Sequence, residues 1–418
     1  MTTEPNPKVT SDQQSIDPLT GRAGEDGEHL VKARCVSNAA QASFAPAALH
    51  AYRADWQHFC AWCDSGELEF ELKNDVPSSL YDAALLLLEI APPRVEVRSK
   101  AERGCDIVAQ QRRSPPVVRV QSRIFAADAA VDVVLQDIGR ACLADFVRNV
   151  PTALAEIPEA VHQMRVAIRH LRSALASVTS KIAEEQYRWA NGELRALMTS
   201  LDAPRNWDVL AEQVLRPVID SRPGDKVFRR LQALVGRERQ SAHQRLKEII
   251  DAPENMVAIL RLARWFEASG WRGEQLSAQA AQLTQPIGEL AQALIARRYR
   301  QAKKRSQDFK SLSPSERHRL RIALKKLRYT IEFLACLFDT DEVDSYLKTL
   351  RPLQDDLGYV NDIRTARIIL GRLNDATDDS AVRQAIKRVL EWHMHNLTHQ
   401  KGRLRKHVHR FRQAKTFW

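Results

Sequence analysis

Residues 161–175 read VHQMRVAIRHLRSAL, and this stretch decides the fold expected for the chain. An α-helix turns by about 100° per residue, so residues at i, i+3, i+4 and i+7 share one face. Val161, Met164 and Ile168 follow that spacing. The opposite face gathers an imidazole and three guanidinium groups, which belong to His162, Arg165, Arg169 and Arg172. The stretch therefore predicts a helix with an apolar core stripe on one side and a cationic stripe on the other.

A second copy of this pattern lies 156 positions later, where residues 317–331 read RHRLRIALKKLRYTI. The shift places His318 on His162, Arg321 on Arg165, Lys325 on Arg169, and Arg328 on Arg172. It continues without a gap from residues 201–208 onto residues 357–364. A period this long indicates two related helical bundles rather than a solenoid of short units.

The composition of the chain narrows the classes of partner. With 418 residues, of which 44% are hydrophobic, the chain is long enough for two or three domains with cores. A net charge of +11 favours a polyanionic partner: nucleic acid, polyphosphate or an acidic membrane surface. A basic surface that is merely solvated is the alternative. Without an apolar run of about 18 residues or a signal-peptide pattern, the sequence predicts a cytoplasmic protein with no membrane span.

The first part of the chain is predicted to be a composite. Residues 1–43 are rich in Ser, Thr, Pro and Gly and predict a disordered leader. Residues 44–65 form a helical pattern, and the string YRADWQHFCAWC within it resembles the first helix of the SAM-like core-binding domain of tyrosine recombinases. Cys60 and Cys63 have no further ligands nearby, so we expect a helical pair of thiols rather than a zinc site.

Residues 66–115 predict a small α/β remnant. GELEFELK at 66–73 alternates with the period of a strand, and a helical pattern follows at about 78–90. Together with the string SKAERGC, this segment resembles the carboxyl end of a CYTH domain, the triphosphate tunnel fold. The resemblance implies metal-facing acids at Glu67, Glu69 and Glu71. The family's amino-terminal ExExK strand is absent from residues 1–65, so we expect these acids to be solvated and no tunnel to close.

Residues 126–418 carry helical patterns throughout, broken at Pro or Gly. They predict an all-α main domain built from two pseudo-repeated antiparallel bundles, with halves at about 126–285 and 286–418. This region resembles the CHAD domain, the conserved-histidine α-helical domain. The resemblance rests on VHQMRVAIRHLRSAL, RNWDVL at 205–210, the basic run at 297–305, RHRLRIALKKLRYTIEF, LQDDLGYVND at 353–362 and the terminal FW.

Rows of lysine and arginine suit a flexible chain of phosphates, which offers regular negative charge and no bases. Cations at i, i+3, i+7 and i+10 make a row about 15 Å long on each repeated helix, and the resemblance implies that the rows contact polyphosphate. The candidate contacts are His162, Arg165, Arg169, Arg172, Arg297, Arg298, Lys303, Lys304, His318, Arg321, Lys325, Lys326, Arg328, Arg405 and Arg412. Two solvated helix faces, with histidines that brace a neighbouring helix, are the structural alternative.

The sequence predicts a non-catalytic binder of inorganic polyphosphate, with targeting to polyphosphate granules as an accompanying expectation, and with no catalytic residue, metal or cofactor. A nucleic-acid binder is the first alternative, although no aromatic residues interleave the cationic stripes. A CYTH-type triphosphatase is the second alternative.

Asp362 is expected to cap a helix or orient an arginine. His393, His395 and His399 lack carboxylates at ligand spacing and are expected on a helix surface.

Overall fold

The structure is a computed structural model, and it describes residues 76–88, 95–97, 116–121, 123–272 and 281–418. The predicted leader, the recombinase-like helix and the strand with Glu67, Glu69 and Glu71 lie outside the described residues. The chain divides into two compact units, Met1–Pro93 and Arg94–Trp418. In the first unit, helix α4 (Ser78–Leu88) confirms the helix expected at about 78–90.

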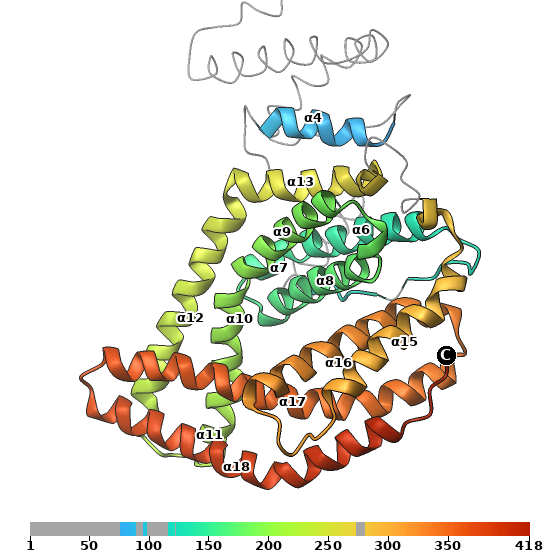
Figure 1. Cartoon of the computed structure of the whole chain (residues 1–418). Helices are drawn as coiled ribbons and strands as arrows, with labels where there is room; N and C mark the ends of the chain where they lie inside the picture. The colour runs from blue at the N-terminus through green and yellow to red at the C-terminus, as the bar shows by residue number, and fades with distance from the viewer. Residues whose placement is uncertain (1–75, 89–94, 98–115, 122, 273–280) are drawn as a thin grey trace, which may run out of the picture. The chain divides into compact units, whose positions relative to one another are not determined.

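The second unit is built from helices, and its described residues contain no strand (Figure 1). This confirms the all-α main domain. Its main helices are α6 (Val131–Arg148), α7 (Val150–Leu154), α8 (Pro158–Ser177), α9 (Glu184–Ser200), α10 (Asp202–Val209), α11 (Arg216–Asp220), α12 (Phe228–Asp251), α13 (Pro253–Glu267), α15 (Ile287–Arg305), α16 (Pro314–Leu334), α17 (Thr340–Ala376) and α18 (Ser380–Gln413). A π-helical segment, η2 (Leu210–Leu215), continues α10 into α11.

The two cationic helices begin in the same way. Both α8 and α16 carry proline in the first turn, where its missing N–H costs nothing and its fixed φ favours the helix. At α16, Ser313 and Glu316 add a capping box. The Ser313 backbone N–H donates to Glu316 Oε2 at 2.8 Å, and Ser313 Oγ accepts from the Glu316 backbone N–H at 3.3 Å. These signals fix where each cationic row starts.

The internal repeat has a structural counterpart at the point where its halves begin. Ala130 and Pro286 form an isolated antiparallel bridge. The Val131 N–H donates to the Gln285 carbonyl at 3.1 Å, and the Ile287 N–H donates to the Ala129 carbonyl at 2.9 Å. A shift of 156 residues exchanges these two bonds, as a pseudo-twofold axis would. The same shift takes the first residue of α6, α8 and α9 onto that of α15, α16 and α17.

The apolar stripes of both cationic helices lie in one shared core. Val161, Met164 and Ile168 of α8 are fully buried, as are Leu320 and Leu324 of α16. Each such side chain contributes roughly 1.5–3 kcal/mol of burial free energy, which holds the two helices with their stripes inward. The repeats are therefore interlocked through a common core and are not two bundles with separate cores.

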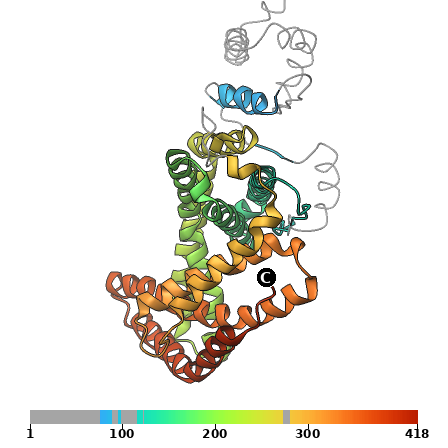
Figure 2. The same cartoon turned by 45° about the vertical axis from the view of Figure 1, so that its right-hand side comes forward.

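A second core also draws on both repeats. It joins η2, α11 and α12 of the first repeat to parts of α17 and α18 of the second. Leu210 and Val214 pack there with Leu370 and Val389. The long helices α17 and α18 lie side by side in both views (Figures 1 and 2). This arrangement fixes α10 and α17 next to the cationic helices.

Candidate functional site

Helices α8 and α16 pack against each other and bring cations from both repeats together. The group comprises His162, Arg165 and Arg169 of α8, Arg205 of α10, and Arg321 and Lys325 of α16, and is here termed the central cluster. Its members act on one another electrostatically: the pKa of Lys325 is lowered from 10.5 to about 6, chiefly by burial and then by the charges of Arg169 and Arg321. A lysine that is largely neutral at pH 7 indicates burial first and a local excess of neighbouring positive charge second.

Burial affects the other members in the same sense. The pKa of His162 is lowered to about 4, chiefly by burial and then by the charges of Arg205 and Arg169. His162 is therefore neutral at pH 7 and contributes hydrogen bonding rather than charge. Burial also lowers the pKa of Arg169 and of Arg321, but an arginine stays protonated in proteins. The central cluster thus keeps its guanidinium charges while Lys325 gives up its proton.

The counter-charges in the central cluster come from other helices. Arg165 forms an ion pair with Asp202 of α10 and donates to the Met198 carbonyl at 3.3 Å. Asp362 of α17 acts favourably on Arg321. The Nε of Arg321 is nevertheless buried without a partner within the described part of the chain. A buried guanidinium donor without an acceptor is costly, so this atom marks a place where an anion would be stabilised.

Asp208 of α10 also faces the central cluster, but its carboxylate is shared. It acts favourably on Arg205, yet its Oδ1 accepts from Arg239 Nε at 2.7 Å and lies 3.0 Å from His243 Nε2. Asp208 is almost fully buried, with 1% of its surface exposed. One carboxylate thus serves three basic groups, and Asp362 and Glu159 also act favourably on Arg205.

A second group of cations lies further along the two helices. Arg172 of α8, Lys326 of α16, and Arg298 and Arg305 of α15 are here termed the lateral cluster. Burial lowers the pKa of Lys326, and the charges of Arg298, Arg172 and Arg305 lower it further. Arg298 is only 7% exposed, and its Nη2 has no partner among the described residues. A buried, unpaired arginine is a second position that calls for an anion.

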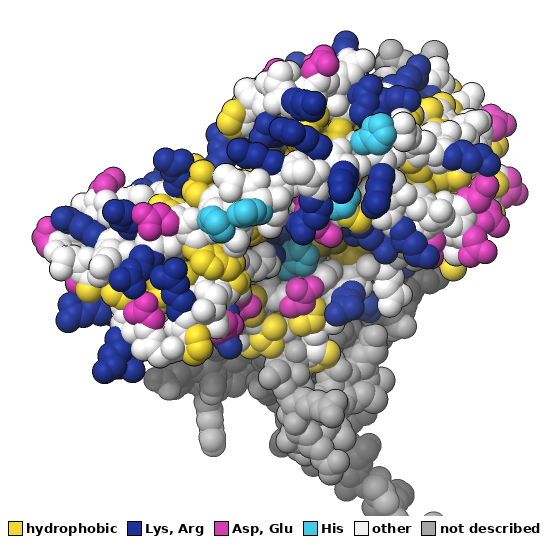
Figure 3. All heavy atoms as spheres, turned by 90° about the horizontal axis from the view of Figure 1, so that it is seen from below, with side chains coloured by type: hydrophobic (Ala, Val, Ile, Leu, Met, Phe, Trp, Pro, Cys, Tyr) yellow, Lys and Arg dark blue, Asp and Glu magenta, His cyan; other side chains and the backbone are white. Residues whose placement is uncertain are grey.

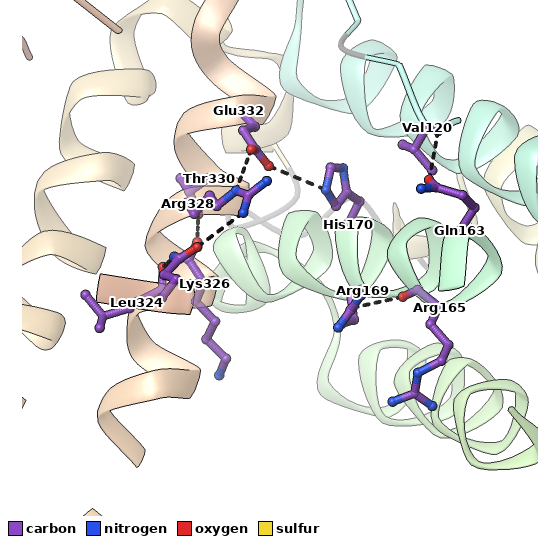
Figure 4. A network of polar contacts seen from close by, with 11 residues as sticks. Val120, Gln163, Arg165, Arg169, His170, Leu324, Lys326, Arg328, Thr330 and Glu332 are labelled. Atoms are coloured by element: carbon purple, nitrogen blue, oxygen red, sulfur yellow. Dashed lines mark hydrogen bonds and ion pairs between the residues drawn. The ribbon is translucent and has the colours of Figure 1, made fainter. Parts of the chain in front are cut away.

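Arg328 does not join either cluster, although the repeat aligns it with Arg172. Its Nε donates to Glu332 Oε1 at 2.6 Å and its Nη1 donates to Gln354 Oε1 at 3.4 Å (Figure 4). His170 Nε2 of α8 lies 3.7 Å from Glu332 Oε2. Burial and the nearby Arg169 and Arg328 lower the pKa of His170 to about 4, so this imidazole is neutral at pH 7. These residues brace α8 against α16.

The remaining candidates of α15 and α16 are dispersed. His318 is exposed, and its Nδ1 lies 3.0 Å from Asn361 Oδ1. Arg297 and Lys304 are also exposed. Lys303 lies over the Tyr299 ring at 5.2 Å from its centroid. None of these four is among the residues that define the central cluster.

The candidates of α18 divide into one structural and one exposed residue. Arg412 Nη1 donates to the Lys303 carbonyl and to Ser306 Oγ, both at 3.2 Å, and so stabilises the carboxyl end of α15. Arg405 is exposed.

The expectation that all three histidines at 393, 395 and 399 lie on a helix surface is wrong for His393, which is fully buried. Its Nε2 hydrogen-bonds to the Val214 carbonyl at 2.9 Å.

Sequence reasoning missed the roles of Arg205 and His170. Arg205 opens the RNWDVL string but lies on a helix of its own, so only tertiary packing places it beside α8. His170 lies inside the quoted stretch at 161–175, and its proximity to Glu332 depends on the other repeat. Neither role has a local signal in the sequence.

On the face seen in Figure 3, Lys and Arg side chains are spread among Asp, Glu and hydrophobic side chains, with histidines between them. No cluster of three or more His, Cys, Asp or Glu residues within the described ranges is arranged to hold a metal. In the same residues, no helix is both long and apolar enough to span a bilayer.

The chain is similar to known helical proteins. Residues 137–371 match the family model of the CHAD domain. The crystal structure of the CHAD domain from the plant Ricinus communis superposes with a TM-score of 0.62 at 24% identity, covering 72% of this chain and 98% of that one. PptA from Streptomyces chartreusis superposes with a TM-score of 0.50 at 16% identity, covering 67% of this chain and 99% of that one. Among curated proteins no match is found. At these identities the two structures support the fold alone.

Proposed function

Because the chain belongs to the CHAD domain family, we propose that its cationic helices bind inorganic polyphosphate without catalysis. The observation that carries this proposal is the central cluster. There, Arg169 and Arg321 from the two repeats are both half-buried, and they act on Lys325, whose pKa is lowered to about 6. Charge and geometry alone support binding of a polyanion. The choice of polyphosphate as that polyanion rests on the family resemblance.

The physical basis of the proposal is the cost of leaving buried cations without counter-charge. Removing a cation from water costs several kcal/mol unless an anion and hydrogen bonds compensate. Arg321 Nε and Arg298 Nη2 are buried donors without acceptors among the described residues. Phosphate oxygens are strong acceptors, and a guanidinium can meet two of them at once. A chain of linked phosphates would supply acceptors to the central and lateral clusters together.

Nucleic acid is the weaker candidate partner for this surface. Binding of single strands without sequence preference uses aromatic rings on which bases stack. Tyr329 is the aromatic residue that acts on Arg169 and Arg321 in the central cluster. Its ring packs against His170 at a centroid distance of 4.7 Å and lies beneath Arg169. A ring that is engaged in this way is a poor platform for a base.

The test is a direct comparison of ligands. Purified protein is titrated with long-chain polyphosphate, single-stranded DNA and duplex DNA at two salt concentrations, because every polyanion loses affinity with salt. We expect polyphosphate to bind most tightly at both concentrations. DNA that bound equally well or better would contradict the proposal. Release of phosphate from triphosphate with Mg²⁺ would instead support the triphosphatase alternative.

A charge-reversal pair localises the binding. Arg165→Glu with Arg321→Glu should abolish polyphosphate retention while the helical circular dichroism is preserved. The matched control is Arg229→Glu with Arg237→Glu, which changes the net charge equally at two exposed positions of α12. If the control lost as much affinity as the test variant, the binding would depend on overall charge and not on the central cluster.

A further inference from the structure

Helix α18 carries two exposed histidines one helical turn apart, His395 and His399. Their Nε2 atoms lie 3.1 Å from each other, and their ring centroids are 4.4 Å apart. This pair lies outside the central and lateral clusters as defined above. Two imidazole nitrogens that converge from positions i and i+4 of a helix form a preset pair of metal ligands.

The helix that carries the pair is firmly held at this point. His393 is fully buried, with Nε2 at 2.9 Å from the Val214 carbonyl and Nδ1 at 2.7 Å from the Tyr359 hydroxyl. By helix geometry His395 and His399 lie about 200° and 240° around the axis from His393. They therefore project from the side of α18 that is opposite to the anchored side. A site built on a rigid helix keeps its ligands at a fixed separation.

We infer that His395 and His399 form a two-nitrogen site for a transition-metal cation of the Cu²⁺ or Ni²⁺ class. Imidazole nitrogens bind such metals at about 2.0–2.1 Å. Two nitrogens 3.1 Å apart then subtend an angle of about 95–102° at the metal. That angle lies about midway between the right angle of tetragonal and octahedral geometry and the tetrahedral angle, so the order of affinities, and not the angle, decides between the metals. Cu²⁺ has the highest affinity in the divalent series.

Metal binding requires one proton to move within the histidine pair, and no net proton is lost. One Nε2 now donates its proton to the other, whereas a metal needs a lone pair on both. The donating ring therefore takes the tautomer with its proton on Nδ1, and both imidazoles remain neutral. Because both side chains are exposed, water completes the coordination. The site is thus a bidentate surface site with open positions, distinct from a closed structural metal site.

The experiment titrates the full chain with Cu²⁺ in a weakly coordinating buffer and follows binding by calorimetry and electron paramagnetic resonance. We expect the wild type to bind one equivalent whose spectrum shows two nitrogen ligands. His395→Ala and His399→Ala should each weaken that equivalent at least tenfold. His409→Ala, at another exposed histidine of α18, is the matched control and should bind like the wild type.

Thermal denaturation provides a second readout, since a metal that binds only the folded helix raises the melting temperature. The rise with Cu²⁺ should be present in the wild type and in His409→Ala, and absent in the His395→Ala, His399→Ala double variant. Both positions are exposed, so unchanged circular dichroism of the double variant shows that its fold is intact. Tight Cu²⁺ binding that persists in the double variant with the same spectrum would overturn the inference.

Discussion

The affinity for polyphosphate should depend on pH through Lys325. In the free protein the pKa of this lysine is lowered to about 6 by burial and by the charges of Arg169 and Arg321. Bound phosphates would oppose those charges and raise the pKa back toward its ordinary value of 10.5. Binding would then be accompanied by uptake of a proton at any pH between the two values. The affinity is therefore highest below about pH 6 and falls as the pH rises toward the bound-state pKa.

The size of the effect follows from the pKa difference. Each pH unit between the free and the bound pKa changes the binding free energy by about 1.4 kcal/mol, which is tenfold in affinity. Between pH 7 and pH 9 the affinity should fall by up to about 100-fold. This window avoids His162, whose pKa in the free protein is about 4. The internal phosphates of the ligand stay ionised throughout the window, so the slope reports on the protein.

Calorimetry in two buffers of different ionisation enthalpy measures the proton uptake, and we expect about one proton per binding event at pH 8. Lys325→Gln should remove both the uptake and most of the slope. Lys325→Arg keeps a charge at all pH values, so it should flatten the profile and bind more tightly than the wild type at pH 9. A Lys325→Gln variant with the wild-type slope would refute the reasoning, because the titrating group would then lie elsewhere.

Three further substitutions test separate parts of the structure. Asp202→Asn frees Arg165 from its ion pair and should raise the polyphosphate affinity by up to about fivefold, the value of a partly exposed pair, as measured by titration at low salt. Arg328→Ala should lower the free energy of unfolding by about 1–3 kcal/mol in urea denaturation while the affinity stays within about twofold. Gly139→Ala places a Cβ 2.1 Å from a phenylalanine ring and should cost about 1–3 kcal/mol. The control Gly192→Ala meets no atom within 4 Å and should stabilise the helix by up to about 1 kcal/mol.

Much of the helical fold could be predicted because its signals are local. The apolar spacing at 161–175 identifies the buried face of α8, where Val161 and Met164 are fully buried. The repeat at 156 residues identifies the equivalence of α8 and α16. The interlocking of the repeats could not be predicted, because it depends on which helix ends meet in space. The second core, which joins α12 to α18, has no periodicity of its own.

The candidate site shows where a repeat stops being informative. Aligned residues share a helix position but not the same neighbours. Arg172 donates to Asn191 at 3.1 Å, whereas the aligned Arg328 is held by Glu332. Position 176, the counterpart of Glu332, is an alanine, so the first repeat lacks this brace. The Glu332 carboxylate, one helical turn from Arg328, therefore makes this predicted ligand contact a structural residue.

The differences between the repeats also predict the order in which the arginines of the central cluster would contact a phosphate. Asp202 holds Arg165 in the free protein, and its counterpart in the second repeat is Gly358. Arg321 therefore lacks the equivalent carboxylate and retains a buried Nε without a partner among the described residues. An arriving phosphate should meet Arg321 first, because no ion pair has to be broken there. Arg165 joins only when the ligand displaces Asp202. Under the proposed function, the two repeats would divide the binding of the anion: Arg321 of the second repeat would contact it first, and Arg165 of the first repeat would follow at the expense of its ion pair with Asp202.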